Sequence, residues 1–236
     1  MSEIQTLARW IKESSFTVAL TGAGMSTESG IPDFRSQSGW WNNIDPATVA
    51  TVEALEENYE LFQQFYASRM QGLRACTPHR GHAILAEWEQ RGFLHSVATQ
   101  NVDGFHQQAG SRNVYELHGS IRTVRCSTCD DQTELEDFLA GKACPHCKGR
   151  LRPDVVLFGE MLPQEPWQRA LADIRSAELV IVIGTSLQVY PVAQLPLMTQ
   201  GRVAILNYEP TAQDDHFELV IHGKAGELLQ QINSQI

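Results

Sequence analysis

The chain alternates short apolar runs with longer segments whose apolar residues recur at helical spacing. Ile4, Leu7, Ala8 and Ile11 place one apolar face on a first helix. The apolar runs predict buried strands at residues 16–20, 94–99, 114–117, 179–183, 203–206 and 217–221. Because such strands alternate with helices, we predict an α/β fold, a doubly wound, Rossmann-like parallel sheet that binds ligands at the carboxyl ends of its strands.

Helix starts and ends can also be read from the sequence. Thr77-Pro78 predicts a helix start, with the threonine hydroxyl as the N-cap and proline at the first helical position. This helix should end before Gly92, where glycine interrupts the pattern. A last helix is predicted from about Ala225.

Two segments interrupt the alternation of strands and helices. Residues 39–74 are aromatic at first and then helical, and residues 121–151 hold four of the five cysteines. The helical segment carries four apolar side chains that we place on one face: Leu61, Phe62, Phe65 and Tyr66. We expect 39–74 and 121–151 to form a small helical and zinc-ribbon domain, and 1–38, 75–120 and 152–236 to form the Rossmann-like domain.

The cysteines have the spacing of a metal site. Cys126-x2-Cys129 and Cys144-x2-Cys147 are separated by fourteen residues. Two such pairs place four thiolates around a tetrahedral Zn²⁺ with no open position, so the predicted zinc is structural. Disulfides would need an oxidising compartment, which the N-terminal sequence does not indicate. Cys76 lies outside the set and is expected to be an ordinary buried thiol.

Composition and charge narrow the classes of partner. The 236 residues carry a net charge of −10, which argues against non-specific binding to nucleic acid or anionic membranes. The charge either favours cationic partners or is that of an ordinary acidic protein. Charged residues interrupt the N-terminal stretch, and no run of about 18 apolar residues occurs. We therefore expect a cytoplasmic protein with no membrane segment. A monomer is expected as well.

A glycine-rich loop follows the first predicted strand. Gly22 and Gly24 would let backbone amides approach a phosphate, but the next glycine is Gly30. The dinucleotide fingerprint of dehydrogenases needs a third glycine three residues after the second. The spacing therefore argues against hydride transfer, although NAD-dependent dehydrogenase remains a rival class.

Polar residues also follow the next two strands. Gln100, Asn101 and Asp103 suit recognition of a ribose or a carboxamide, or form an Asx turn that caps a helix. His118-Gly119 follows the strand after that. A histidine at a strand end is either structural or a base that accepts a proton near neutral pH.

Seven motifs together resemble the sirtuin family of NAD-dependent protein-lysine deacylases. They occur in the family's order: GAGMSTESGIPDFR, TQNVDG, ELHGS, the paired CxxC, RPDVVLFGE, GTSLQVYP and LNYEP. The resemblance implies that NAD is a consumed co-substrate and that acylated-lysine proteins or peptides are the substrates. It implies NAD contacts from Gly22, Ala23, Gly24, Ile31, Phe34, Arg35, Gln100, Asn101, Asp103, Gly184, Thr185, Ser186, Asn207, Glu209 and Ala225. It implies catalytic roles for Asn101 and for His118, the general base, and a peptide-binding strand at Val156, Leu157 and Phe158.

Three positions resemble the sirtuin class that removes succinyl, malonyl and glutaryl groups. Tyr66-x-x-Arg69 matches that class's acyl-binding pair, and Ala50 matches its small pocket residue. A hydroxyl and a guanidinium three residues apart on one helix can both reach an acyl carboxylate. The alternative is a core aromatic followed by a solvated arginine. Asp33 follows the pattern of ordinary deacetylases, so acetyl removal is expected as well.

Other functions stay open as rivals. A plain deacetylase without preference for acidic acyl groups is the nearest one, and mono-ADP-ribosyl transfer is a possible side activity. A zinc-ribbon nucleic-acid-binding module is disfavoured, because acidic residues interleave with the basic ones of 121–151 and no aromatic pair is present to stack bases.

Overall fold

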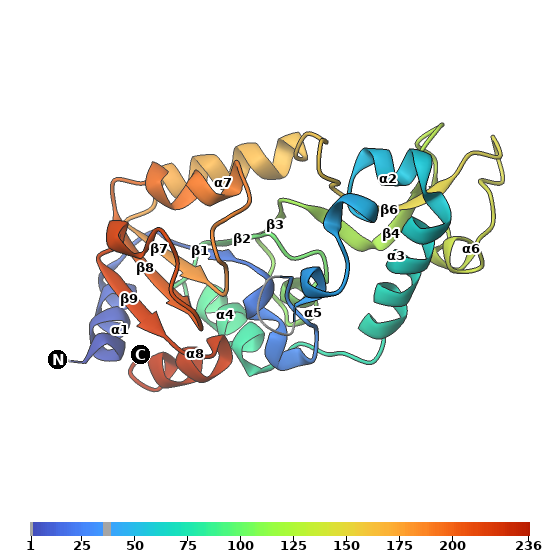
Figure 1. Cartoon of the computed structure of the whole chain (residues 1–236). Helices are drawn as coiled ribbons and strands as arrows, with labels where there is room; N and C mark the ends of the chain where they lie inside the picture. Colours follow the sequence, from blue (N-terminus) through green and yellow to red (C-terminus); the bar gives the residue numbers. More distant parts are fainter. Residues whose placement is uncertain (1, 35–38) are drawn as a thin grey trace.

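A six-stranded parallel sheet forms the centre of the larger part of the molecule (Figure 1). The computed structural model describes residues 2–34 and 39–236, except for the side chain of Trp41. The strands, in spatial order, are β3 (Val114–Glu116), β2 (Ser96–Thr99), β1 (Thr17–Thr21), β7 (Leu179–Ile183), β8 (Arg202–Asn207) and β9 (Leu219–His222). Every predicted strand is present, with ends shifted by at most two residues. The order reverses between β1 and β7, and ligands bind at such a switch point.

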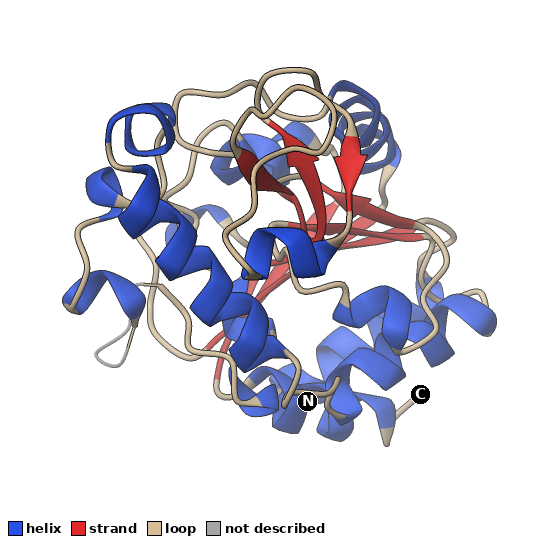
Figure 2. Cartoon of the chain, turned by 90° about the vertical axis from the view of Figure 1, so that its right-hand side faces the viewer, coloured by secondary structure: helices blue, strands red, loops and turns tan. Residues whose placement is uncertain are grey.

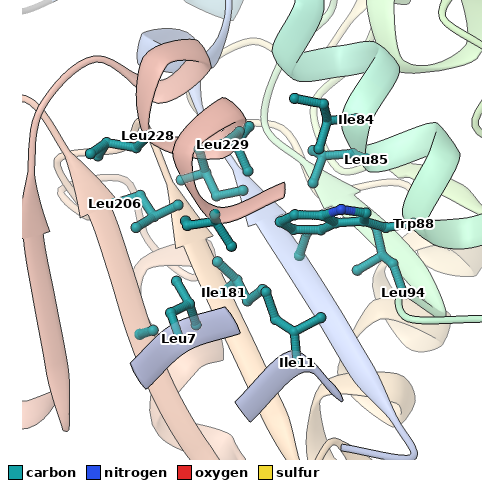
Figure 3. Packing of buried hydrophobic residues seen from close by; sticks show 14 of the residues in the cluster. Leu7, Ile11, Ile84, Leu85, Trp88, Leu94, Ile181, Leu206, Leu228 and Leu229 are labelled. Carbon is teal, nitrogen blue, oxygen red and sulfur yellow. The ribbon is translucent and has the colours of Figure 1, made fainter. Parts of the chain in front are cut away.

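Helices cover both faces of this sheet, and the two chain ends lie near each other (Figures 1 and 2). One face is covered by α1 (Glu3–Glu13), α4 (Arg80–Gln90) and α8 (Ala225–Asn233), and the other by α7 (Gln164–Ser176) and the 3-10 helix η5 (Val192–Met198). Successive residues of a strand point to opposite faces, so Ile181 of β7 packs with Leu7, Trp88 and Leu229 (Figure 3), whereas Val180 packs with α7.

The predicted start of α4 is wrong. The helix begins at Arg80, and its N-cap is His79, not Thr77. The His79 Nδ1 accepts a hydrogen bond of 3.0 Å from the Gly81 amide, so a histidine side chain replaces the expected threonine hydroxyl. The ends of α4 and α8 agree with the sequence, because α4 stops at Gln90 and α8 begins at Ala225.

The two insertions pack together beside the large sheet (Figure 1). They contribute η3 (Trp40–Asn42), η4 (Pro46–Thr48), α2 (Val52–Glu57), α3 (Tyr59–Leu73), α6 (Leu135–Leu139) and an antiparallel sheet of β5 (Gln132–Thr133), β4 (Gly119–Cys126) and β6 (Leu151–Val155). Side chains of α3 bond the ribbon: the Tyr59 hydroxyl donates to the Leu151 carbonyl at 2.8 Å, and the Gln63 amide donates to the Phe138 carbonyl at 2.8 Å.

The helical face predicted for this part needs one correction. Phe62, Phe65 and Tyr66 are buried in its core, but Leu61 is 40% exposed and lies on the solvent side of α3. The small sheet runs from Gly119 to Val155, beyond the inserted range 121–151, and the division into two domains stays a prediction. Within 2–34 and 39–236, no helix has the length and apolar character needed to cross a membrane.

Candidate active site

A cleft of about 1360 Å³ lies where the carboxyl ends of the large sheet face the small part, which is the helices and the small sheet formed by the two insertions. This volume exceeds that of an ordinary small-molecule pocket, so it can hold a dinucleotide together with part of a second substrate. The predicted site residues that line it are Ala23, Gly24, Ile31, Phe34, Ala50, Tyr66, Arg69, Gln100, Asn101, Asp103, His118, Val156, Leu157, Phe158, Gly184, Thr185, Ser186, Asn207, Glu209 and Ala225. Arg35 lies outside the described residues.

Gly22 does not line the cleft, and its contacts give another reason for glycine there. A Cβ at position 22 would lie 2.6 Å from the Thr185 Cβ, and one at Gly24 would lie 2.9 Å from the Gly184 Cα. The Gly24 amide donates to the Gly184 carbonyl at 2.8 Å, and Gly184 has a φ of +62°. The loops after β1 and β7 can meet this closely only without side chains.

Ser26 joins the glycine loop to the loop after β2. Its hydroxyl donates to the Asp103 Oδ2 at 2.7 Å and accepts from the Asn101 side-chain amide at 3.1 Å. The Asp103 Oδ1 accepts from the Phe105 amide at 2.9 Å, so the Asx turn exists alongside the cleft-lining role. Burial raises the pKa of Asp103, and the hydrogen bonds from Phe105 and Ser26 partly oppose that rise. Sequence reasoning missed Ser26, although it lies inside the first motif.

Two buried histidines lie next to this network, and sequence reasoning missed both. His82 of α4 and His106 of α5 (Phe105–Gln108) have ring centroids 5.0 Å apart. The His106 Nε2 lies 3.0 Å from the Thr21 Oγ1. Burial, reinforced by the neighbouring histidines, lowers the pKa of His82 to about 2 and that of His106 to about 3. Both rings are therefore neutral at physiological pH.

His118 follows β3 and faces the cleft. Its Nδ1 lies 3.1 Å from the Gln100 carbonyl oxygen. Since a carbonyl only accepts, the proton is assigned to Nδ1, and Nε2 then carries the lone pair of a base. The Gln100 side chain in turn donates to the Thr185 Oγ1 at 3.0 Å, which links the loops after β2 and β7. These contacts fix the orientation of the candidate base.

The acyl-pocket candidates come from the small part. The Arg69 guanidinium carbon lies 5.2 Å from the Phe34 ring centroid, 5.5 Å from that of Phe65 and 5.7 Å from that of Tyr66. No hydrogen bond or ion pair joins Arg69 to any residue that the structure describes. Burial raises the pKa of Tyr66 and lowers that of Arg69. Arg69 is thus a half-buried cation among aromatic rings, which contradicts the alternative of a solvated arginine.

The candidate peptide-binding segment is held by its own neighbours. The Val156 amide donates to the His118 carbonyl at 2.9 Å, the Leu157 amide to the Glu160 Oε2 at 2.8 Å, and the Phe158 amide to the Ala50 carbonyl at 2.8 Å. All three N–H groups are therefore engaged. The Leu157 and Phe158 carbonyls already accept from the Glu160 and Val52 amides at 3.0 and 3.4 Å, so the Val156 carbonyl is the group of this segment that can bond an added strand.

A buried ion pair fixes the turn that follows this segment. Arg152 is 4% exposed and binds both carboxylate oxygens of Glu160, with the longer contact at 2.9 Å. The Arg152 guanidinium also donates to the Val155 carbonyl at 2.7 Å. Glu160 thereby connects Arg152 to the Leu157 amide, and sequence reasoning had assigned neither charged residue a role.

Comparison with known proteins decides the family. The model of the Sir2 family matches residues 22–191. The chain belongs to the Sir2 family. The NAD-dependent protein deacetylase 1 of Geobacillus kaustophilus (strain HTA426) is 48% identical over 236 residues, which is 98% of each chain. The NAD-dependent protein deacylase of Thermococcus sibiricus (strain DSM 12597 / MM 739) is 42% identical over 97% of this chain and 94% of its own.

Solved Sir2 structures share the fold over their whole length. One, described as Sir2-p53 peptide-NAD+, has a TM-score of 0.91 and 34% identity, and the match covers 100% of this chain and 98% of that one. Another, a Sir2 complex with deacetylated p53 peptide and 3'-O-acetyl ADP ribose, has a TM-score of 0.95 and 33% identity over 99% and 98% of the two chains. The resemblance to sirtuins and the Rossmann-like fold class are confirmed.

The metal site of this Sir2-family chain has the geometry that zinc requires. Cys126, Cys129, Cys144 and Cys147 are free thiols whose Sγ atoms all lie within 4.8 Å of one another. The Cys126–Cys147 and Cys129–Cys144 sulfur distances are 3.4 and 3.7 Å. A tetrahedral Zn²⁺ with bonds of about 2.3 Å separates sulfurs by roughly 3.8 Å. The four thiolates fill the coordination sphere, so the zinc would support the ribbon and take no part in the reaction.

Proposed function

We propose that the chain is an NAD-dependent protein deacylase that consumes NAD to remove acyl groups from lysine side chains. One observation carries the proposal. In a chain of the Sir2 family, the candidate base His118, the Gln100–Asp103 loop and the glycine loop converge on one cleft at the switch point of the sheet. A protein with only a structural zinc ribbon would not need that convergence.

NAD would lie along the carboxyl ends of the strands. Its phosphates would approach the closely packed loops after β1 and β7, which line the cleft at Ala23, Gly24, Thr185 and Ser186. We assign the remaining contacts as follows: the adenosine to Asn207, Glu209 and Ala225, the nicotinamide ribose to Gln100 and Asn101 under Phe34, and the carboxamide to Asp103 and Ile31. Asp103 is buried and already bonded to Ser26, so its orientation is set before NAD enters.

His118 would act as the general base. When bound, NAD supplies a ribose carbon that accepts the acyl oxygen as nicotinamide leaves. The Gln100 carbonyl keeps the His118 proton on Nδ1, so Nε2 accepts a proton from a ribose hydroxyl, and the oxygen of that hydroxyl attacks the acyl carbon. Water completes the transfer, and the products are free lysine, nicotinamide and O-acyl-ADP-ribose.

The substrate would bind as an extended segment along residues 156–158. Since the three amides there are engaged and the Leu157 carbonyl already accepts from the Glu160 amide at 3.0 Å, the Val156 carbonyl oxygen would accept a hydrogen bond from the substrate backbone. The Arg152–Glu160 pair would hold this segment in place. Main-chain bonding of this kind gives affinity with little dependence on sequence. It fits an enzyme that acts on acylated lysines in many sequence contexts.

We further propose that the enzyme removes succinyl and malonyl groups as well as acetyl groups. Arg69 has aromatic neighbours and feels the charge of Asp103, but it makes no hydrogen bond or ion pair with a described residue. Tyr66, Arg69 and the small Ala50 line the same cleft. An acyl carboxylate would supply the missing partner of the guanidinium and accept from the Tyr66 hydroxyl. An acetyl group would fill the same space without using either polar group.

Two assays with the wild-type enzyme test these proposals. The first incubates NAD with an acyl-lysine peptide: a deacylase releases nicotinamide and O-acyl-ADP-ribose, whereas a dehydrogenase forms NADH. The second compares kcat/KM on acetyl-, succinyl- and malonyl-lysine peptides of one sequence. A higher value for the acidic acyl groups is expected. Deacetylation without measurable desuccinylation would leave the plain deacetylase as the function.

A further inference from the structure

One acidic side chain ties the glycine loop to the far end of the cleft. The loop forms two consecutive 3-10 turns, η1 (Ala23–Met25) and η2 (Thr27–Ser29), and Glu28 lies in the second. The Glu28 Oε2 accepts a hydrogen bond of 2.6 Å from the Gly226 amide. Gly226 is the second residue of α8, directly after Ala225, and both Glu28 and Ala225 line the cleft.

Helix α8 offers a favourable position for this carboxylate. The first amides of a helix have no partner within the helix, and the positive end of the helix dipole attracts an anion. The side chain of Lys224, the residue before α8, does not cap the helix, because its ammonium group only donates hydrogen bonds. Glu28 therefore supplies from the glycine loop a hydrogen bond that α8 lacks locally.

The start of α8 also lies close to His79, the N-cap residue of α4. A Cβ at position 226 would lie 2.9 Å from the Glu28 Oε2 and 2.8 Å from the His79 Nδ1. Because His79 Nδ1 accepts from the Gly81 amide, its Nε2 carries the proton and donates to the Met25 carbonyl at 2.6 Å. The loop is thus held at Met25 by the start of α4 and at Glu28 by the start of α8.

We propose that Glu28 is a positioning residue for NAD. It holds the glycine loop in a fixed position relative to the adenosine end of the cleft. This inference rests on the proposed function, because it takes the cleft to be the NAD site. Between Gly24 and Glu28 lies Ser26, which orients Asp103 and Asn101. Glu28 therefore connects the helix beside the adenosine contact to the loop that orders the nicotinamide contacts, without itself touching the reacting atoms.

Three substitutions test this role: Glu28→Ala, Glu28→Asp and Glu28→Gln. Alanine removes the acceptor and aspartate is one methylene too short to reach Gly226, so both should raise KM and Kd for NAD about tenfold. The kcat and the KM for the acyl peptide should stay within about twofold of wild type. Glutamine keeps an acceptor oxygen at the same reach, and it should restore the KM for NAD to within about threefold.

Glu165→Ala serves as the matched control, since Glu165 is also an acidic residue in the first turn of a helix but is exposed and outside the cleft. Calorimetric titration with NAD and with ADP-ribose gives Kd, and thermal unfolding gives Tm for each variant. A wild-type Kd in folded Glu28→Asp, or an equal loss in Glu28→Gln and Glu28→Ala, would overturn the inference. Equal changes in the KM for peptide and for NAD would also overturn it. If wild type bound no NAD, the proposed function itself would fail.

Discussion

The two ends of the cleft differ in how their polar groups are satisfied. At the end formed by the sheet, Ser26, Asn101, Asp103 and Gln100 bond to one another or to neighbouring loops before any ligand is present. At the end formed by α3, Arg69 is surrounded by aromatic rings and bonds to no described carboxylate or carbonyl. In our proposal the first end is preorganised for NAD, the constant co-substrate. In the same proposal the second end keeps its hydrogen-bonding capacity for the variable acyl group.

The largest expected effect comes from His118, which lies between the two ends. His118→Ala should lower kcat by about 10²- to 10⁴-fold, because it removes the group that accepts the ribose proton. Kd for NAD should stay within about twofold, since the preorganised contacts remain. Steady-state kinetics and calorimetry measure the two quantities, and exposed His216→Ala is the control. Near-normal turnover in His118→Ala would remove the base from our mechanism.

Acid should lower the stability of the fold through the two buried histidines beside the preorganised end. His82 and His106 have folded-state pKa values of about 2 and about 3, below the ordinary value of 6.5. At a pH between the folded-state values and 6.5, the unfolded chain binds protons that the folded chain excludes. Stability is therefore lost as the pH falls below about 6.5. From pH 6.5 to 5, each histidine should lower the free energy of unfolding by roughly 2 kcal/mol. Asp103 has a raised pKa, so its protonation stabilises the fold as the pH falls and opposes this loss. About 4 kcal/mol is therefore the largest loss in the free energy of unfolding expected from the two histidines together.

Urea unfolding between pH 7 and 5, with Zn²⁺ in excess, measures this loss. His106→Gln removes one of the two titrating groups and should lower the slope of stability against pH by about half. A free energy of unfolding that is flat over this range would contradict the burial of neutral histidines.

Arg69→Met tests the acyl end. A hydrogen bond to a charged group contributes roughly 1.5–3 kcal/mol, so kcat/KM for succinyl-lysine should fall about 10- to 150-fold. Methionine keeps the apolar volume, and deacetylation should change by less than about threefold. Arg74→Met is the control, an exposed arginine at the end of the same helix that pairs with Glu136. Equal loss on acetyl and succinyl peptides would show that Arg69 only supports the fold.

Tyr66→Phe should give the smallest effect. It removes one hydroxyl and leaves the ring packed against Phe62 and Phe65. The acyl carboxylate is a charged acceptor, so the loss of this one neutral donor should lie at the lower end of roughly 1.5–3 kcal/mol, and desuccinylation should fall about tenfold while deacetylation is unchanged. If the losses in Arg69→Met and Tyr66→Phe are not additive, both residues bind the same carboxylate. That result would strengthen the assignment of the α3 end to the acyl group.

The sequence predicted the strands, the four zinc ligands and most of the cleft. Strand positions followed from apolar runs, because a parallel sheet covered on both faces needs apolar side chains in both directions. The start of α4 could not be predicted, since His79 caps it with a ring nitrogen while a better capping pair precedes it. Leu61 was misplaced because helical spacing alone does not say which edge of an apolar face meets a neighbour.

By itself the sequence determined what each loop contains: the glycines, the acid and amides after β2, His118 after β3, and the paired cysteines. Local spacing and residue chemistry suffice for these, because the residue types and their spacing within each segment identify each motif. Only the tertiary structure decided which loops meet. The Ser26–Asp103 bond and the Glu28–Gly226 contact join elements that are distant in the sequence through the packing of helices on the sheet. Gly22 shows the difference most clearly, since its motif suggested a phosphate contact and its close packing against Thr185 is what requires a glycine.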